Sequence, residues 1–195
     1  TTSTFATERL EAPVVNKDGG IYSSKITVRV TIPEGARLRY TNDGTTPTET
    51  NGILSTTGVI ALNSTTVLRF RLFKDGYLPS RVVTRSYIFT DRELNLPIIS
   101  VVTDPVNLYS DSLGIMVEGV NGRPGNGMDT PCNWNMEWDR PVNIEYFTQE
   151  GKSVINQEVN MEMFGGWIRM WSPHSFKLKA NKIYEGENYI PYQVF

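Results

Sequence analysis

The stretch SSKITVRVTI (residues 23–32) alternates apolar and polar side chains along its length. Its apolar members are Ile26, Val28, Val30 and Ile32, and each is separated from the next by a threonine or an arginine. A repeat of two residues is typical of a β-strand with one face buried and the other in water. The stretch therefore predicts a half-buried strand.

Four further short apolar stretches follow, separated by turn-forming residues. They are ARLRYT (36–41), GVIAL (58–62), TVLRFRLF (66–73) and RVVTRSYIF (81–89). The segments between them contain the Gly, Pro, Asn and Asp residues that favour turns, and no helical repeat interrupts them. The sequence predicts a small antiparallel β-sandwich over residues 12–90, preceded by an N-terminal tail (1–11).

The second half differs in character. NLPIISVVTD (95–104) is a continuous apolar run, typical of a strand buried on both faces. In DPVNLYSDSLG, Asp104 is a candidate N-cap, Pro105 a first helical residue and Gly114 a stop signal, which together predict a short helix. Residues 117–135 are rich in Gly, Pro and Asn and predict a long loop.

The remaining stretches of the second half predict strands. Residues 140–166 suggest two strands around the turn QEGK, with Ile155, Val159, Met161 and Met163 on one face. HSFKLKANKIY (174–184) suggests another. The chain then ends on YIPYQVF, which is apolar and aromatic, so we expect it to be a fragment of a larger domain.

Composition limits the classes of function. The chain has 195 residues, 39% of them hydrophobic, as expected for a globular protein of one or two domains. Its net charge of -2 argues against a nucleic-acid partner, and no apolar segment has the ~20 residues of a transmembrane helix. One cysteine and one histidine argue against a Cys/His zinc site, so no metal site is predicted. The basic residues outnumber the acidic ones 11 to 7 up to Thr90 and fall behind 8 to 14 after it, which suggests a boundary there.

Residues 10–52 and 64–89 resemble the chitobiase/β-hexosaminidase C-terminal-type module. The resemblance lies in the pattern Gly-Gly-x-Tyr at 19–22, the turn YTNDGTTPT (40–48) and the segment GYLPSRVVTRSY (76–87). It implies an immunoglobulin-like β-sandwich that is appended to bacterial secreted proteins. Asp43 and Gly44 suit the turn, and Tyr40 and Tyr87 suit large anchors in the core or at its edge.

The second half resembles the opening of a spore-coat-protein-H-like (CotH) kinase domain. The similar stretches are LPIISVVTDPVNLYSDSLGIMVEG (96–119), WNMEWDRPVNIEYFTQEG (134–151) and MEMFGGWIRMWSPHSFKLKAN (161–181), in the family's order. The resemblance implies that residues 95–195 form the β-rich start of an α+β kinase-like domain in a secreted or cell-surface protein. The family's catalytic and metal-binding aspartates lie beyond Phe195, so the fragment itself is expected to be inactive and without cofactor. ATP and Mg²⁺ are implied for the full-length parent.

The candidate phosphate-binding residues are Gly165, Gly166, Arg169 and His174. A glycine-rich turn brings backbone N–H groups close to a phosphate, and an arginine supplies a fork of donors. By the resemblance, Arg169 matches a family arginine, whereas His174 stands where the family has a phosphate-contacting lysine. The alternative interpretation is a plain hairpin, with Trp167 and Trp171 covering an edge.

Two other groups of side chains allow two interpretations each. Lys177, Lys179 and Lys182 suit either a positive rim for phosphate or the solvated face of a strand. Trp134 and Trp138 suit either sugar stacking or packing.

Beside these tryptophans, Arg140 suggests a local ion pair with Glu137 or Asp139. The function predicted is therefore a fragment of a CotH-like, ATP-dependent kinase parent. The alternative is a non-enzymatic binding or scaffold protein at the cell surface, with a protein or a glycan as partner.

Overall fold

The computed structural model describes residues 6–184 and 188–193. Their contacts divide the chain into two compact units. The first runs up to Ser100 and also includes Glu145–Val154; the second comprises Val101–Ile144 and the residues from Ile155 onward. The predicted domain boundaries at residues 90 and 95 stay predictions.

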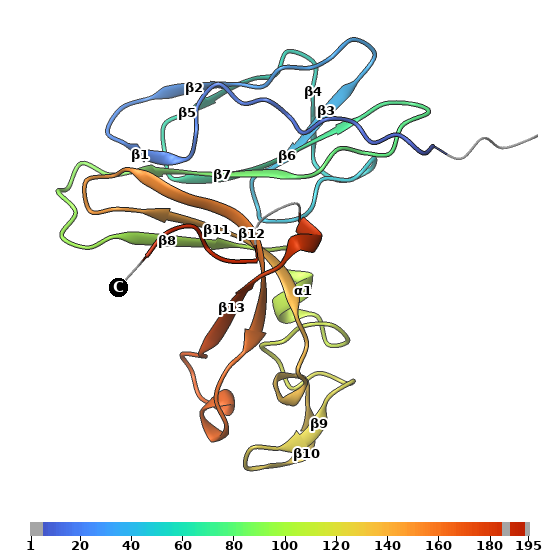
Figure 1. Ribbon diagram of the computed structural model, residues 1–195, viewed down its shortest axis with the longest axis vertical. Helices are drawn as coiled ribbons and strands as arrows, with labels where there is room; N and C mark the ends of the chain where they lie inside the picture. Colours follow the sequence, from blue (N-terminus) through green and yellow to red (C-terminus); the bar gives the residue numbers. More distant parts are fainter. Residues whose placement is uncertain (1–5, 185–187, 194–195) are drawn as a thin grey trace, which may run out of the picture. The chain divides into compact units, whose positions relative to one another are not determined.

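The first unit contains two β-sheets. The larger has five strands in the order β1 (Gly20–Tyr22), β7 (Val83–Phe89), β6 (Thr66–Phe73), β3 (Arg37–Thr41) and β4 (Ile53–Ser55). The smaller is an antiparallel pair of β2 (Ile26–Arg29) and β5 (Val59–Leu62), which runs as a separate layer in Figure 1. The opening stretch of the sequence thus supplies β2, in which Ile26 and Val28 are buried.

One hydrophobic core joins these two sheets. Its buried members come from β2, β3, β5, β6 and β7, together with Val30, and they are Ile26, Val28, Val30, Leu38, Ile60, Leu62, Leu68, Phe70, Leu72 and Tyr87. Burial of each large side chain stabilises the fold by about 1.5–3 kcal/mol. Two sheets packed around one such core are the sandwich that the alternating sequence predicts.

The sandwich differs from the prediction in one pairing. β1 runs parallel to β7, with Gly20 opposite Tyr87 and Tyr22 opposite Phe89. The sheet is therefore mixed rather than wholly antiparallel. Sequence alternation identifies strands but carries no information about the direction of the partner, which here is far along the chain.

The predicted turn after Tyr40 is confirmed. Gly44 has a φ of 83°, a left-handed value that glycine adopts without a steric penalty. The Asp43 carboxylate accepts hydrogen bonds from the backbone N–H of Thr45 at 3.0 Å and from its hydroxyl at 2.6 Å. These bonds lower the pKa of Asp43.

The other large sheet has four strands in the order β13 (Phe176–Ala180), β12 (Ser153–Met163), β11 (Arg140–Phe147) and β8 (Ile98–Val102). The two predicted strands around QEGK are β11 and β12, and the strand predicted from residue 174 onward is β13. Ile155, Val159, Met161 and Met163 are all buried, as their shared face predicts. The sequence pattern was therefore sufficient for this hairpin.

The prediction for residues 95–104 was wrong about burial. β8 lies at the edge of its sheet, and Ile99 and Val101 are exposed while Val102 is buried. An edge strand has a neighbour on one side only, so an apolar run need not be covered on both faces.

The predicted short helix is present as α1 (Val106–Tyr109). The Asp104 carboxylate accepts a hydrogen bond from the N–H of Val106 at 3.2 Å, which supports its predicted position at the start. The helix ends at Tyr109, before Gly114, so the predicted stop lies too far along the chain.

The prediction of one long loop over residues 117–135 was also wrong. The segment contains a hairpin of β9 (Arg123–Gly125) and β10 (Met128–Cys132), followed by the 3-10 helix η1 (Asn133–Asn135). Asn126 and Gly127 form its two-residue turn, with φ values of 51° and 84°. Asn-Gly favours such turns because both residues tolerate positive φ.

Candidate functional site

The candidate site lies in the loop between β12 and β13. The two strands pair antiparallel up to Met163 and Phe176, and the N–H of Phe164 donates to the carbonyl of Ser175 at 2.9 Å. Residues 164–175, called the Trp loop below, therefore leave the sheet and return to it at one point. They contain all four residues predicted to bind a cofactor, Gly165, Gly166, Arg169 and His174.

The two glycines start the short 3-10 helix η2 (Trp167–Met170). Gly165 has a φ of 98°, and a Cβ atom there would lie 2.5 Å from Cγ1 of Ile168. Only glycine fits this position. The pair thus has a structural role that requires no phosphate.

The Arg169 side chain binds backbone carbonyls inside the unit. Its Nε donates to the carbonyl of Gly165 at 2.5 Å, and its Nη1 donates to the carbonyl of Trp134 at 3.3 Å. The guanidinium therefore bonds across the turn that begins at the glycines, and it connects the loop to η1. Two nitrogens of the predicted phosphate fork are used in this way.

His174 closes the other side of the loop. Its Nδ1 lies 3.0 Å from the carbonyl oxygen of Arg169, and its ring centroid lies 6.3 Å from that of Trp134. The carbonyl can only accept, so Nδ1 carries the proton in this contact. Trp134 is 8% exposed, which rules out a role for it as an open stacking platform.

The structure therefore brings three of the four predicted residues together. Gly165, Arg169 and His174 are joined by hydrogen bonds within the Trp loop, and Gly166 faces the side chain of Asn126. Their predicted contact with phosphate stays a prediction. The bonds they make connect one part of the Trp loop to another.

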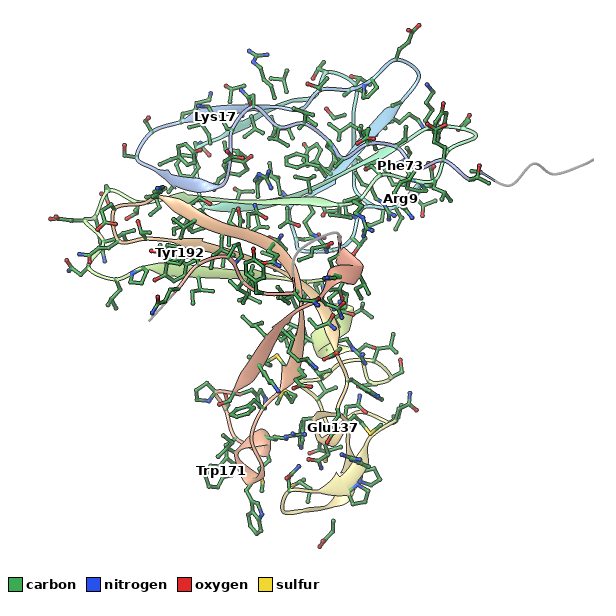
Figure 2. The ribbon with its side chains drawn as sticks, viewed as in Figure 1. Arg9, Lys17, Phe73, Glu137, Trp171 and Tyr192 are labelled. Atoms are coloured by element: carbon green, nitrogen blue, oxygen red, sulfur yellow. The ribbon has the colours of Figure 1, made fainter. Side chains whose placement is uncertain are left out.

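The two tryptophans of the Trp loop do not have the role that the sequence suggested for them. Trp167 is 67% exposed and Trp171 is 62% exposed, so neither covers an edge as the hairpin interpretation proposed. Figure 2 shows Trp171 on the outside of the ribbon at the end of this loop. The available signal was two tryptophans four residues apart in a segment bounded by Gly-Gly and Ser-Pro.

The Trp loop rests on the turn of the β9–β10 hairpin. A Cβ atom on Gly127 would lie 2.8 Å from Cε of Met170 and 3.1 Å from Cε3 of Trp167. The side chain of Asn126 in turn donates to Oδ1 of Asn135 at 2.8 Å. The glycine allows the indole and the thioether to approach the backbone closely.

Buried asparagines hold this hairpin. Asn133 is fully buried; its Nδ2 donates to the carbonyls of Asp111 and Gly114, and its Oδ1 accepts from the N–H of Asn121. The Nδ2 of Asn135 donates to two carbonyls of β9. Satisfied buried amides of this kind give an irregular segment a single conformation.

The lysines of β13 are neutralised by acids. Lys179 Nζ lies 2.6 Å from Asp139 and 3.0 Å from Glu162, and Lys177 pairs with Glu162 at 3.5 Å. The hydrogen bonds to Asp139 and Glu162 raise the pKa of Lys179. Lys177 and Lys179 therefore do not form an unopposed positive rim.

The predicted ion pair of Arg140 is replaced by other contacts. Arg140 donates from Nε and Nη2 to the carbonyl of Leu113, and its guanidinium lies 4.8 Å from the ring centroid of Trp138. Glu137 pairs instead with Arg123 at 3.5 Å, and Asp139 with Lys179. Trp138 is half-buried under the arginine, which supports its predicted role in packing.

Two absences concern residues 6–184 and 188–193. This part of the chain contains no group of three or more His, Cys, Asp or Glu side chains arranged to hold a metal ion. None of its helices is long and apolar enough to cross a membrane.

Comparison with known proteins identifies a relationship for the first half. Residues 17–84 match the family model of the chitobiase/beta-hexosaminidase C-terminal domain. No curated protein and no solved structure matches the chain. The matched segment covers β1 to the start of β7, and an immunoglobulin-like sandwich fits it. Residues 17–84 are therefore similar to a domain associated with carbohydrate-active proteins.

Proposed function

We propose that the chain is a non-catalytic, carbohydrate-binding accessory module of a secreted or surface protein, and that Trp167 and Trp171 contact the glycan. The observation that carries this proposal is the exposure of both indoles, 67% and 62%, on a loop whose backbone accepts hydrogen bonds from Arg169 and His174. Exposed apolar groups that lie close together mark binding sites, and Trp167, Ile168 and Trp171 are all exposed within five residues of this loop.

The chemistry of tryptophan suits a sugar ligand. An indole offers a flat apolar face to the C–H face of a pyranose ring, while its N–H remains a hydrogen-bond donor. The N–H of Trp171 donates to the carbonyl of Ile168 at 3.1 Å, and Trp167 begins the same 3-10 helix, so one short turn carries both indole rings. Two indoles on one turn can engage successive sugars of a chain.

The loop also limits the entropy lost on binding. Arg169 bonds to the carbonyl of Gly165 before η2, His174 bonds to the carbonyl of Arg169 within η2, and Trp167 packs on Gly127. A tryptophan has only two side-chain torsions to order, and a fixed backbone removes further cost. In this proposal the predicted phosphate residues hold the platform instead of contacting the ligand.

The family match supports the accessory role. The name of the matched domain refers to chitobiase and beta-hexosaminidase, and this suggests a module that accompanies carbohydrate chemistry. Insoluble polysaccharides lie outside the cell, so the proposal includes export of the protein to the surface or the medium.

Co-sedimentation with insoluble polysaccharides tests the proposal. The 195-residue chain is incubated with chitin, cellulose and peptidoglycan, next to the Trp167→Ala/Trp171→Ala variant. Tyr109→Ala is the matched control, because Tyr109 is a comparably exposed aromatic on α1. Wild type and control should sediment with at least one polysaccharide, and the double variant should stay in solution. Sedimentation of all three proteins alike, or of none, contradicts the proposal.

A CotH-like kinase parent that uses ATP and Mg²⁺ is the second candidate. It is favoured by the ordered resemblance of residues 96–181 and by the convergence of Gly165, Arg169 and His174 in one loop. The donors of Arg169 and His174 that have partners are bound to carbonyls, so the residues as arranged do not fit a phosphate group. This candidate is therefore the weaker one.

Nucleotide titration tests the second candidate. Mg-ATP is added to the wild-type chain and to His174→Lys, which restores the family's residue, and binding is measured by calorimetry. Binding that strengthens about tenfold in His174→Lys supports a nucleotide site. If neither protein gives a heat of binding, nucleotide binding by this chain is excluded.

A further inference from the structure

Glu145 is a carboxyl group with no exposed surface, on strand β11. It belongs to the same compact unit as the sandwich, together with the rest of the segment Glu145–Val154. Carboxyl groups are seldom fully buried, because desolvation of the charge is costly. A glutamate in this position is therefore sensitive to its state of protonation.

The Glu145 side chain fits against a glycine in the approach to β1. A Cβ atom on Gly19 would lie 2.2 Å from Oε1 of Glu145 and 3.1 Å from the carbonyl oxygen of Ser86. The absence of a side chain at Gly19 thus creates the space that the carboxyl group occupies. This contact joins the end of β11 to the β1–β7 edge of the sandwich.

Hydroxyl groups also lie beside Glu145. Ser86 on β7 hydrogen-bonds the carboxyl group through its side chain and its backbone. The Ser86 hydroxyl lies 2.8 Å from that of Ser100 on β8. The charged and titratable groups nearby are Asp18 before β1 and Arg85 and Tyr87 on β7.

The cation among those neighbours, Arg85, also contacts a second carboxylate. Arg85 Nε lies 3.4 Å from Asp18 Oδ1, so the arginine is shared with another carboxylate. Burial raises the pKa of Glu145 to about 7, against the smaller lowering effects of Ser86 and Arg85. The direction agrees with the geometry of a fully buried acid.

The segment that Glu145 begins has a second contact with the sandwich. At its turn, Gly151 has a φ of 81°, and a Cβ atom there would lie 3.4 Å from Cδ1 of Ile21 on β1. Figure 1 shows the turn between β11 and β12 beside β1. Contacts at its first residue and at its turn hold the segment to one edge of the sandwich.

We propose that Glu145 is a proton-controlled latch, which holds residues 145–154 on the β1–β7 edge when protonated and loosens them when ionised. The sign follows from linkage. The proton is bound more tightly in the docked state than in the open state, in which the pKa is near the ordinary 4.5. Docking is thus most stable below pH 4.5, and this extra stability is lost as the pH rises to about 7.

Hydrogen exchange of the 195-residue chain tests the latch. Exchange in residues 145–154 is measured from pH 5 to pH 8.5 and corrected for the intrinsic rate of each amide. The opening equilibrium of wild type should rise about tenfold per pH unit between pH 5 and 7 and level off above. Glu145→Gln, which cannot ionise, should show no such rise, and strands β3 and β6 should be unaffected in both proteins.

Two outcomes overturn the proposal. One is protection of residues 145–154 that does not change with pH in wild type, and the other is an unchanged pH profile in Glu145→Gln. If Glu145→Gln fails to fold, Asp18→Asn replaces it, because removal of the neighbouring negative charge should lower the pH at which wild-type opening levels off. An Asp18→Asn profile identical to wild type then contradicts the assignment to Glu145.

Discussion

Nδ1 of His174 lies 3.0 Å from the carbonyl oxygen of Arg169, and this contact fixes the end of η2 from outside the helix. Arg169 Nε donates in turn to the carbonyl of Gly165. Two side chains of the Trp loop therefore bond to backbone carbonyls of the same loop. The only histidine of the chain therefore acts as a brace, whichever ligand the loop meets.

Replacement of His174 by alanine should loosen the Trp loop. One hydrogen bond to the Arg169 carbonyl is lost, at a cost of about 1 kcal/mol, so the amides of residues 164–175 should exchange about fivefold faster. His174→Asn retains a short side-chain donor and should stay near wild type. Equal exchange in wild type and His174→Ala would show that the contact does not brace the loop.

Gly19→Ala should destabilise the first unit by about 2 kcal/mol. The new methyl group would overlap Oε1 of Glu145, and backbone lies on its other side. Gly20→Ala is the matched control, since a Cβ atom there meets nothing closer than 3.5 Å. Urea denaturation followed by circular dichroism compares the two, and a Gly19→Ala midpoint equal to that of Gly20→Ala would contradict the close packing.

Asn133→Ala should cost about 3 kcal/mol in the second unit. It removes the partner of two backbone carbonyls and one N–H in a buried position. Asn121→Ala, which removes an exposed side-chain bond to Ser112, should cost well under 1 kcal/mol. Tryptophan fluorescence reports unfolding of this unit, because all four tryptophans lie in it, and similar midpoints for both variants would refute the role given to Asn133.

Tyr87→Phe should lower the free energy of unfolding by about 1 kcal/mol, because the hydroxyl of this fully buried ring donates to the carbonyl of Lys17 at 3.0 Å. Burial raises the pKa of Tyr87, so the group stays neutral and remains a donor through the physiological range. Tyr22→Phe loses a more exposed bond to Asp18 and should cost less. Thermal unfolding measures the loss of stability in each variant. A larger loss in Tyr22→Phe than in Tyr87→Phe would contradict the prediction.

Local sequence patterns predicted the strands that have one buried face and one solvent-exposed face. Ile26 and Val28 of β2, and Val159 and Met161 of β12, follow the repeat of two that the sequence shows. Local signals also identified α1 and the turn at Asp43. Each of these features depends on residues close together in the chain.

The features that the sequence did not reveal depend on distant partners. The burial of Glu145 follows from Gly19 and Ser86, which lie more than fifty residues away. The parallel pairing of β1 with β7 is of the same kind. The hairpin turn at Asn126 and Gly127 is different, because the Asn-Gly signal was present within a segment that its many glycines suggested was irregular.

The candidate site was located correctly along the chain, but its chemistry differs from the prediction. A pattern of Gly-Gly, Arg and His does not show whether the side chains face a ligand or the backbone, and here Arg169 and His174 face backbone carbonyls. The same loop exposes Trp167 and Trp171.

Titration of the chain with chitohexaose, followed by calorimetry, tests the central claim most directly. Wild type and Tyr109→Ala should bind the oligosaccharide with the same affinity. Trp167→Ala and Trp171→Ala should each weaken binding about tenfold, the loss expected when one aromatic anchor is removed. Binding of equal strength in all four proteins, or no heat from wild type with this sugar or with cellohexaose, would contradict a glycan site on the Trp loop.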